Sequence, residues 1–146
     1  MLNKFSDESL NVIVKAREES GILQHNHVGC EHLLLGLLHS NDKQLKFVWE
    51  KCEVVLEEVR NSLKKIMEPS IPFIQRESIV FSPKAIQLFQ WAESRSINRN
   101  SKYIEPFDLL YVLLEEDISI ACSVLKEEYD LTFEMLKRGL HEIEAL

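Results

Sequence analysis

The sequence predicts an all-α protein of about eight helices, arranged as two pseudo-symmetric four-helix repeats. Apolar residues recur at helical spacing along most of the chain, and no stretch shows a sustained two-residue alternation. A 34-residue segment of the first half is repeated in the second half at a fixed offset. With four glycines and four prolines in 146 residues, the chain offers few points at which a helix must end.

The internal repeat aligns residues 5–38 with residues 81–114 at an offset of 76 and without a gap. The identical positions cluster where helix caps and core residues are expected. In the first copy they are Phe5, Ser6, Ala16, Ser20, Leu33, Leu34, Leu37 and Leu38. We place the copies at about residues 2–67 and 81–145, joined by a proline-containing linker at about 68–80. Two copies are fewer than a solenoid usually needs, so we expect one domain spanning 1–146.

In each copy, the spacing of apolar residues predicts four helices in the same order. The first follows an N-cap serine, Ser6 or Ser82, because a serine hydroxyl accepts from the free amides at a helix start. A proline directly after Ser82 strengthens that prediction, since the first helical residue needs no amide proton. A polar loop follows, then a helix with the pattern LL-x-x-LL, a short third helix and an amphipathic fourth.

The net charge, the cysteines and the lengths of the apolar runs limit which partners and which cellular compartment fit this sequence. A formal net charge of −7 disfavours nucleic acid or an anionic membrane as the main partner, since both usually require a basic face. Three widely spaced cysteines without a CxxC pattern disfavour a disulfide framework and favour a reducing compartment. No apolar run approaches a membrane span of about 18 residues, and the N-terminus does not resemble a signal peptide. We therefore expect a location in the bacterial cytoplasm or inside an organelle.

The stretch HNHVGCEH, residues 25–32, contains three histidines, a cysteine and a glutamate, which are zinc-ligand residue types. The repeat provides a control for this pattern. At the offset of 76, the second copy keeps the same helix-loop-helix frame and has almost none of these residue types. The frame therefore does not need a metal, and we predict no metal site here. A metal-binding or redox sensor stays an alternative, because Cys30 at a helix start could have a lowered thiol pKa.

The motif N-x-x-G-x-E-H-L-L-L-G-L-L, residues 26–38, follows a helix that opens with Phe-Ser. This combination resembles the double Clp N-terminal domain, and most of all the N-domain of ClpC-type AAA+ unfoldases. The resemblance covers about residues 2–145, although the second copy departs from the motif at residues 105–109. It implies a docking domain for adaptors and substrates, without catalysis and without a cofactor. The sequence agrees, since it has no P-loop, GxSxG or HExxH motif.

The resemblance also implies a pocket for phosphorylated arginine, made by the hydroxyl at a helix start and the glutamate of the motif. In this chain these residues are Ser6 and Glu31. A helix N-terminus attracts phosphate, and a carboxylate can pair with a guanidinium. In the second copy Phe107 takes the position of Glu31, so we expect at most one pocket. The alternative is that Ser6 and Glu31 only stabilise helix starts.

Aromatic residues are candidates for a second site at which a partner protein binds. Trp91 takes the position of Lys15, which is expected to be exposed, so we predict Trp91 as an exposed anchor for a partner. Other candidates for an apolar groove are Trp49, Phe73, Ile74, Tyr103 and Phe107, although aromatic residues at helical spacing usually belong to the core.

Taken together, the sequence predicts a protein-interaction module that docks adaptors, or unfolded or marked substrate proteins, for a Clp-type unfoldase and its protease. An alternative within the same class is a free-standing regulator that binds the unfoldase or the protease subunits. We predict no enzyme activity, no cofactor, and no binding to nucleic acid or membrane.

Overall fold

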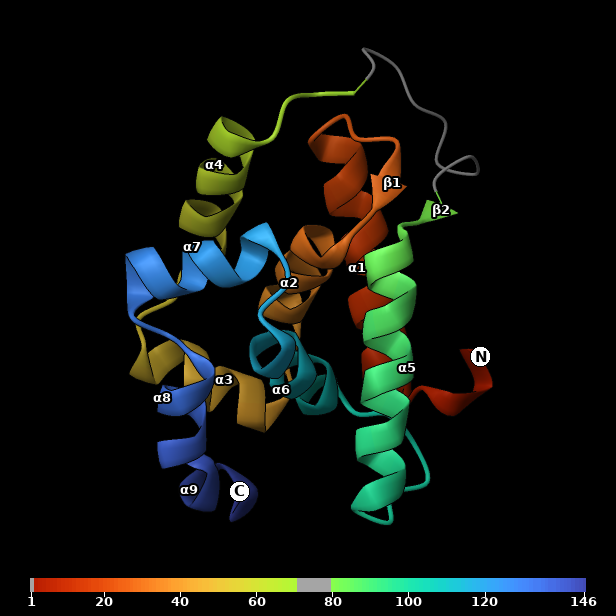
Figure 1. The fold of residues 1–146 in the computed structure, drawn as a ribbon, viewed down its shortest axis with the longest axis vertical. Helices are drawn as coiled ribbons and strands as arrows, with labels where there is room; N and C mark the ends of the chain where they lie inside the picture. The colour runs from red at the N-terminus through yellow and green to blue at the C-terminus, as the bar shows by residue number, and fades with distance from the viewer. Residues whose placement is uncertain (1, 71–79) are drawn as a thin grey trace.

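A computed structural model of the chain describes residues 2–70 and 80–146 (Figure 1). The described residues of the first half form η1 (Leu2–Lys4), α1 (Asp7–Ile22), β1 (His27–Val28), α2 (Cys30–His39), α3 (Lys43–Lys51) and α4 (Leu56–Ile66). Those of the second half form β2 (Val80–Phe81), α5 (Pro83–Asn98), α6 (Pro106–Glu116), α7 (Ile120–Tyr129), α8 (Phe133–Arg138) and α9 (Leu140–Glu144). Most of the expected linker, with Phe73 and Ile74, lies outside the described residues.

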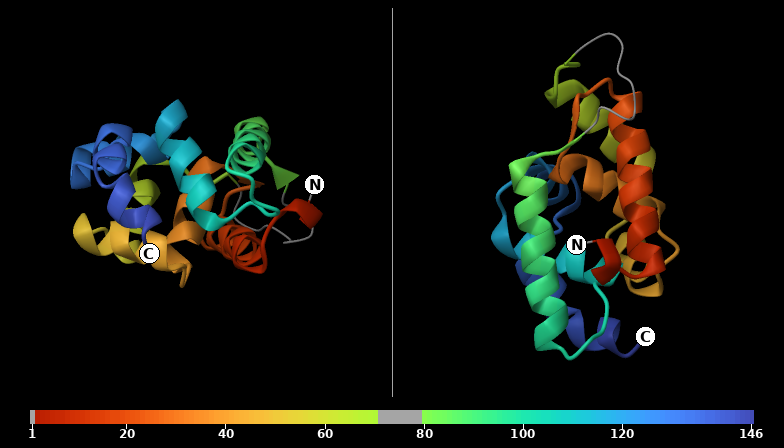
Figure 2. Two further views of the ribbon diagram at one scale, coloured as in Figure 1. Left: turned by 90° about the horizontal axis from the view of Figure 1, so that it is seen from below. Right: turned by 90° about the vertical axis from the view of Figure 1, so that its right-hand side faces the viewer.

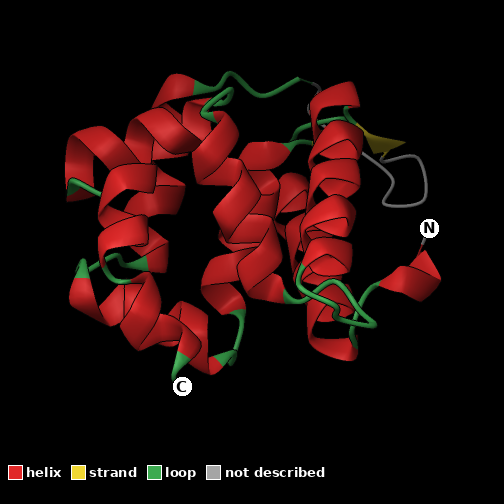
Figure 3. Cartoon of the chain, turned by 60° about the horizontal axis from the view of Figure 1, so that its bottom comes forward, coloured by secondary structure: helices red, strands yellow, loops and turns green. Residues whose placement is uncertain are grey.

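The all-α prediction is confirmed, and helices form nearly all of the regular secondary structure that Figure 3 shows. The two repeats are visible in the helix bounds. Helices α1 and α5 have 16 residues each, and their bounds differ by the offset of 76. The described ranges contain nine α-helices rather than about eight, because the last helix of the second repeat is interrupted at Gly139.

Both predicted N-caps form as expected. Ser6 Oγ accepts a hydrogen bond from the amide of Ser9 at 3.1 Å, and Ser82 Oγ accepts from the amide of Ala85 at 3.1 Å. Each bond satisfies an amide that has no partner within the first helical turn. The two first helices therefore begin at homologous positions with the same local chemistry.

Helix α2 lies at the centre of the fold and packs against helices α1 and α3 to α7 (Figures 1 and 2). Leu33, Leu34, Leu35 and Leu37 of α2 are fully buried, as is Leu109 of α6, while Leu38 is partly buried against the same core. Gly36 brings α2 against α1, since a Cβ at this position would lie 2.3 Å from the carbonyl oxygen of Val12. The buried side chains of both repeats form one continuous core.

The two repeats are joined through short backbone pairings. β1 pairs in parallel with β2, with His27 opposite Val80 and Val28 opposite Phe81. A single bridge between Phe5 and Ile104 is the symmetric counterpart of this pairing. The loop before the second helix of each repeat thus lies beside the start of the first helix of the other repeat. This exchange decides which residues share a site.

Each repeat buries one carboxylate against arginine. Glu19 of α1 accepts from both Arg60 Nε, at 2.7 Å, and Arg60 Nη2, at 2.6 Å, and also interacts with His39 at 2.8 Å. Burial alone would raise the pKa of Glu19, but the hydrogen bonds from Arg60 and His39 outweigh it and lower that pKa.

In the second repeat Asp108 is fully buried and receives hydrogen bonds from Arg95 and Arg99. The bond to Asp108 also raises the pKa of Arg99.

Among the described helices, none is both long and apolar enough to span a bilayer.

Candidate docking site

Ser6 lies against the second repeat. Its amide donates to the carbonyl oxygen of Ile104 at 3.0 Å, and the neighbouring Ser9 hydroxyl donates to the same oxygen at 2.7 Å. Ile104 belongs to the loop that precedes α6. The start of α1 is therefore fixed beside the start of α6, and not beside the start of α2.

Glu31 lies beyond the other end of α1. The loop that leads to it is held there by Ser20, whose hydroxyl donates to the carbonyl oxygen of His27 at 2.5 Å. Since α1 has 16 residues, its two ends are about 24 Å apart at 1.5 Å per residue. The expectation that Ser6 and Glu31 share one pocket is therefore corrected. The repeats exchange partners, and this places the two residues at opposite ends of α1.

Glu31 instead shares a surface depression of about 390 Å³ with the start of the second repeat. Its lining residues are His27, Gly29, Glu31, Ser82, Pro83 and Lys84. The backbone is held in place by the amide of Ser82, which donates to the carbonyl oxygen of Val28 at 2.9 Å. Gly29 leaves room for the carboxylate, because a Cβ there would lie 2.9 Å from Glu31 Oε2.

The electrostatics of this depression combine both signs. Helices α2 and α5 both begin here, and each helix start carries partial positive charge. Lys84 is exposed and adds an ammonium group, one proton of which is donated to the carbonyl oxygen of Ile118 at 3.0 Å. Glu31 supplies the opposite charge. The depression thus places two helix starts and an ammonium group, which attract an anion, beside a carboxylate, which attracts a cation.

The symmetric counterpart, where α1 and α6 begin, has different chemistry. Phe107 replaces Glu31 there and is buried, with 3% of its surface exposed. Glu8 takes the position of Lys84, and its carboxylate accepts from Ser40 Oγ at 3.1 Å and from the amide of Asn41 at 3.2 Å. At this position the equivalent of Glu31 is therefore buried and apolar, and the equivalent of Lys84 is an acidic residue that bonds within the protein.

Ser82 and Lys84 were not predicted as partners of Glu31. The sequence contains one relevant signal, the change from Glu8 to Lys84 between the copies, which adds a cation at a helix start. The pairing of β1 with β2, however, cannot be deduced from the repeat alone.

The histidines of HNHVGCEH lie close together without forming a metal centre. The ring centroids of His25, His27 and His32 are 5.0 to 6.0 Å apart. The amide of Gly29 donates to His32 Nδ1 at 2.9 Å, and His32 Nε2 faces His25 Nδ1 at 2.7 Å. Both nitrogens of His32 are thus used in protein contacts. Within residues 2–70 and 80–146, no group of three or more histidine, cysteine or acidic residues is placed to hold a metal ion.

Cys30 is buried, and its environment is opposite to that of a reactive thiol. Burial, with a smaller contribution from Glu31, raises the pKa of Cys30 to about 12. The possibility that the helix start lowers this pKa is therefore wrong, because desolvation of the thiolate outweighs the helix dipole. A redox sensor based on this thiol is disfavoured.

Trp91 is partly buried and packs against the core, so its side chain is less available to a partner than we expected. Of the other aromatic candidates, Trp49 is buried and donates from Nε1 to the carbonyl oxygen of Leu37 at 3.3 Å. Phe107 is buried as well, while Tyr103 is 41% exposed. The role of Trp91 as an anchor stays a prediction.

Comparison with known proteins places this fold among Clp proteins. Residues 4–128 match the family model of the Clp repeat (R) N-terminal domain. Over 135 residues, 90% of the chain, the sequence is 33% identical to an ATP-dependent Clp protease ATP-binding subunit ClpA homolog from Guillardia theta. Over 126 residues, 86% of the chain, it is 30% identical to the chloroplastic chaperone protein ClpC from Pisum sativum. These matches span only 16% and 14% of the two relatives.

Solved structures show the same fold at lower identity. The N-terminal domain of ClpD from Arabidopsis thaliana superposes with a TM-score of 0.78 at 22% identity, covering 94% of this chain and 95% of that one. The N-domain of ClpV from Vibrio cholerae gives a TM-score of 0.75 at 19% identity, covering 97% and 86%. A ClpV N-domain in complex with a VipB peptide gives 0.70 at 20% identity, covering 97% and 88%.

Proposed function

The chain belongs to the family of Clp repeat N-terminal domains, and from this premise we propose that it is a non-catalytic module that docks adaptors or substrate proteins for a Clp-type AAA+ unfoldase. Its relatives include an ATP-binding subunit of a Clp protease and a chaperone, of which it spans about one seventh. The ClpV N-domain, which has the same fold, has been solved with a bound peptide, and this supports a peptide-docking role.

The finer proposal is that the Glu31 depression recognises phosphorylated arginine. The supporting observation is that Glu31 and Lys84 lie in one depression at which two helices begin. The Glu31 carboxylate would pair with the guanidinium, while the start of α5, the Ser82 hydroxyl and Lys84 would bind the phosphate. Ser82 Oγ accepts from Ala85, and the same hydroxyl can donate its own proton to a phosphate oxygen.

An NMR titration of labelled protein with free phosphoarginine tests this assignment. We expect amide shifts around Gly29, Glu31 and Lys84, and we expect Glu31→Gln or Ser82→Ala to weaken binding about tenfold. Ser6→Ala is the matched control, because it removes the same type of cap at a similar cost of about 1 kcal/mol but lies at the other end of α1.

Two outcomes would contradict the phosphoarginine assignment. One is the absence of shifts at millimolar phosphoarginine. The other is equal binding by wild type and Glu31→Gln. Arginine alone and inorganic phosphate alone should each bind more weakly, since each satisfies only one half of the depression.

The alternative, a free-standing regulator, differs in how it would act on the unfoldase. Added in trans to a Clp unfoldase and protease, a regulator would change the rate of substrate degradation. An N-domain that acts only when joined to its own ATPase rings would leave that rate unchanged. Chloroplastic proteins are among the relatives, so an organelle stroma and the bacterial cytoplasm are both proposed locations.

A further inference from the structure

His27 lines the Glu31 depression, and one edge of its ring faces the same point as the Glu31 carboxylate. A Cβ built on Gly29 would lie 3.4 Å from both Nε2 and Cδ2 of His27, and 2.9 Å from Glu31 Oε2. Because glycine has no side chain, the space between the imidazole nitrogen and the carboxylate oxygen stays open. The proposed phosphoarginine site has so far assigned no role to His27.

Backbone and ring contacts hold His27 in this position. Its carbonyl oxygen accepts from Ser20 Oγ at 2.5 Å, and the residue pairs with Val80 in the sheet of β1 and β2. Its partly buried ring lies against the rings of His25 and His32, with centroids 6.0 and 5.3 Å away. A side chain held in this way loses little conformational freedom when a ligand binds to it.

Asn26 determines which nitrogen of the His27 ring can accept a hydrogen bond. His27 Nδ1 lies 3.3 Å from Asn26 Oδ1, and an amide oxygen can only accept. In the neutral ring Nδ1 therefore carries the proton, and Nε2 carries a lone pair. Among the contacts of residues 2–70 and 80–146, neither His27 Nε2 nor the Glu31 carboxylate has a hydrogen-bond partner. Both can therefore accept from a ligand.

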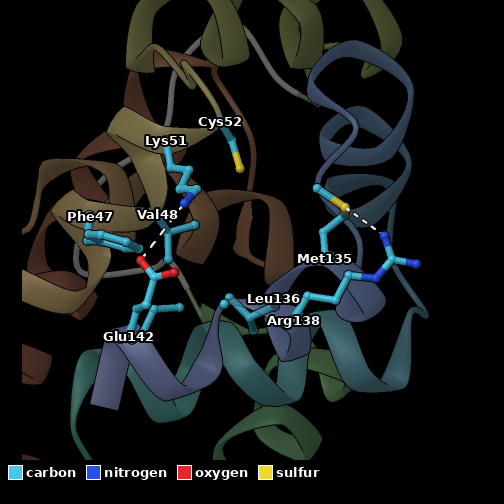
Figure 4. A pocket seen from close by; sticks show the side chains of 10 residues that line it. Phe47, Val48, Lys51, Cys52, Met135, Leu136, Arg138 and Glu142 are labelled. Carbon is cyan, nitrogen blue, oxygen red and sulfur yellow. Dashed lines mark hydrogen bonds and ion pairs between the residues drawn. The ribbon is translucent and has the colours of Figure 1, made fainter. Parts of the chain in front are cut away.

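A surface groove between α3 and the pair α8–α9 lacks such an unpartnered carboxylate (Figure 4). Its volume is about 180 Å³, and its charged side chains contact other residues that line it. Lys51 forms an ion pair with Glu142 at 3.9 Å, and Arg138 donates to Met135 Sδ at 3.8 Å. The Glu31 depression is therefore the better candidate for binding a cationic group.

A guanidinium can use a second acceptor beside a carboxylate. Its N–H donors lie in one plane and point in several directions, and phosphorylation of a terminal nitrogen removes only one of them. A carboxylate can accept two parallel N–H bonds, which leaves other donors at the edges of the plane. An imidazole nitrogen at the side of the carboxylate can accept from one of these. An ammonium group is a compact charge without a fixed plane, so it gains less from this arrangement.

We propose that His27 is a ligand-binding residue of the Glu31 depression, and that its Nε2 accepts a hydrogen bond from the guanidinium of phosphoarginine. Asn26 is then a positioning residue, because it keeps the ring proton on Nδ1. Glu31 and His27 bind the guanidinium, while the start of α5 and Lys84 bind the phosphate. The inference rests on the proposed recognition of phosphoarginine and adds a determinant of specificity to it.

NMR titration of the full 146-residue chain with phosphoarginine tests this role. His27→Phe keeps a flat ring against the neighbouring histidines but removes the acceptor, so phosphoarginine should bind about tenfold more weakly. His27→Gln restores an acceptor and should bind within about threefold of wild type. Tyr103→Ala is the matched control, because it removes a ring at the equivalent position of the second repeat, where Phe107 replaces Glu31. It should bind like wild type.

Inorganic phosphate separates the two halves of the ligand. His27→Phe should bind inorganic phosphate like wild type, since the phosphate meets the start of α5 and Lys84. If His27→Phe weakens both ligands equally, His27 binds the phosphate, and the guanidinium assignment is overturned. In a double-mutant cycle, His27→Phe and Glu31→Gln should not be additive, because both act on one guanidinium. His27→Phe and Ser82→Ala should be additive within about twofold.

A measurement on wild type does not depend on how any variant folds. NMR spectra of the ring nitrogens at about pH 8 should show the His27 proton on Nδ1, and the Nε2 signal should shift when phosphoarginine binds. A proton on Nε2 in the complex would overturn the proposal, because that nitrogen could not then accept. Equal binding of phosphoarginine by wild type and His27→Phe would also overturn it, while the assignment of Glu31 would stand. No binding by wild type would instead overturn phosphoarginine recognition itself, and the role of His27 with it.

Discussion

Lowering the pH from 7 to 5 should destabilise the protein through His32. This residue is fully buried, and burial, with a smaller contribution from His25, lowers its pKa from the ordinary 6.5 to about 3. The amide of Gly29 donates to His32 Nδ1, so the neutral ring carries its proton on Nε2 and donates to His25 Nδ1. A second proton would remove the acceptor that Gly29 needs.

The sign and the size of the effect follow from linkage between protonation and folding. Below pH 6.5 the unfolded chain takes up a proton at His32 while the folded chain does not, so stability is complete above 6.5 and falls toward pH 3. At pH 5, about 1.5 units below 6.5, His32 alone should remove about 2 kcal/mol of unfolding free energy. Burial also lowers the pKa of His25, so this residue adds a loss of the same sign.

Urea unfolding, followed by circular dichroism at pH 7 and at pH 5, measures this loss. His32→Asn keeps an acceptor for the Gly29 amide but cannot take up a proton, so its stability should fall by about 2 kcal/mol less than that of wild type between these pH values. Val59→Ala, which removes fully buried apolar atoms and keeps both histidines, should retain the wild-type pH dependence. An equal loss for His32→Asn and wild type would refute the assignment to His32.

Two further substitutions test the packing that positions the sites. Gly36→Ala would place a Cβ 2.3 Å from the Val12 carbonyl oxygen and push α1 and α2 apart, so urea unfolding should show a loss of about 3 kcal/mol, and an unchanged midpoint would contradict this packing. Arg60→Met should cost about 3 kcal/mol at pH 7, because it leaves the buried Glu19 carboxylate with His39 as its remaining side-chain partner in the described contacts. Because the pKa of Glu19 is lowered, this cost should shrink as the pH falls below about 4.5, and a cost independent of pH would argue against the pair.

Local signals were sufficient to predict the helices and their starts. The caps at Ser6 and Ser82 depend on residues within one helical turn, and the buried leucines follow from spacing within one helix. The repeat added the correspondence between helices of the two halves, and α1 and α5 match it at both ends. These features could be predicted because each depends on neighbours in sequence.

The site could not be assembled in the same way, because its partners come from different repeats. Ser6 and Glu31 belong to one copy, so treating each copy as a unit joined them. The pairing of Val28 with Phe81 instead brings Glu31 to Ser82. A repeat in the sequence shows which residues are equivalent, but it does not show whether the copies form their contacts internally or with each other.

Cys30 shows a second limit of sequence reasoning. A thiol at a helix start is expected to have a lowered pKa when solvent reaches it, and exposure depends on tertiary packing. Here 1% of the residue is exposed, and desolvation raises its pKa to about 12. The same packing explains Trp91, which takes the position of a lysine but lies partly against the core.

The divergence between the copies bears on function. The repeats keep the same leucines in the centre of the fold, but they differ at the residues of the Glu31 depression: Glu31 against Phe107, and Lys84 against Glu8. If the Glu31 depression acts as proposed, this site exists once per chain despite the pseudo-symmetry. Phosphoarginine should then bind with a stoichiometry of one, and two equal sites would mean that symmetric surfaces, and not these diverged residues, carry the binding.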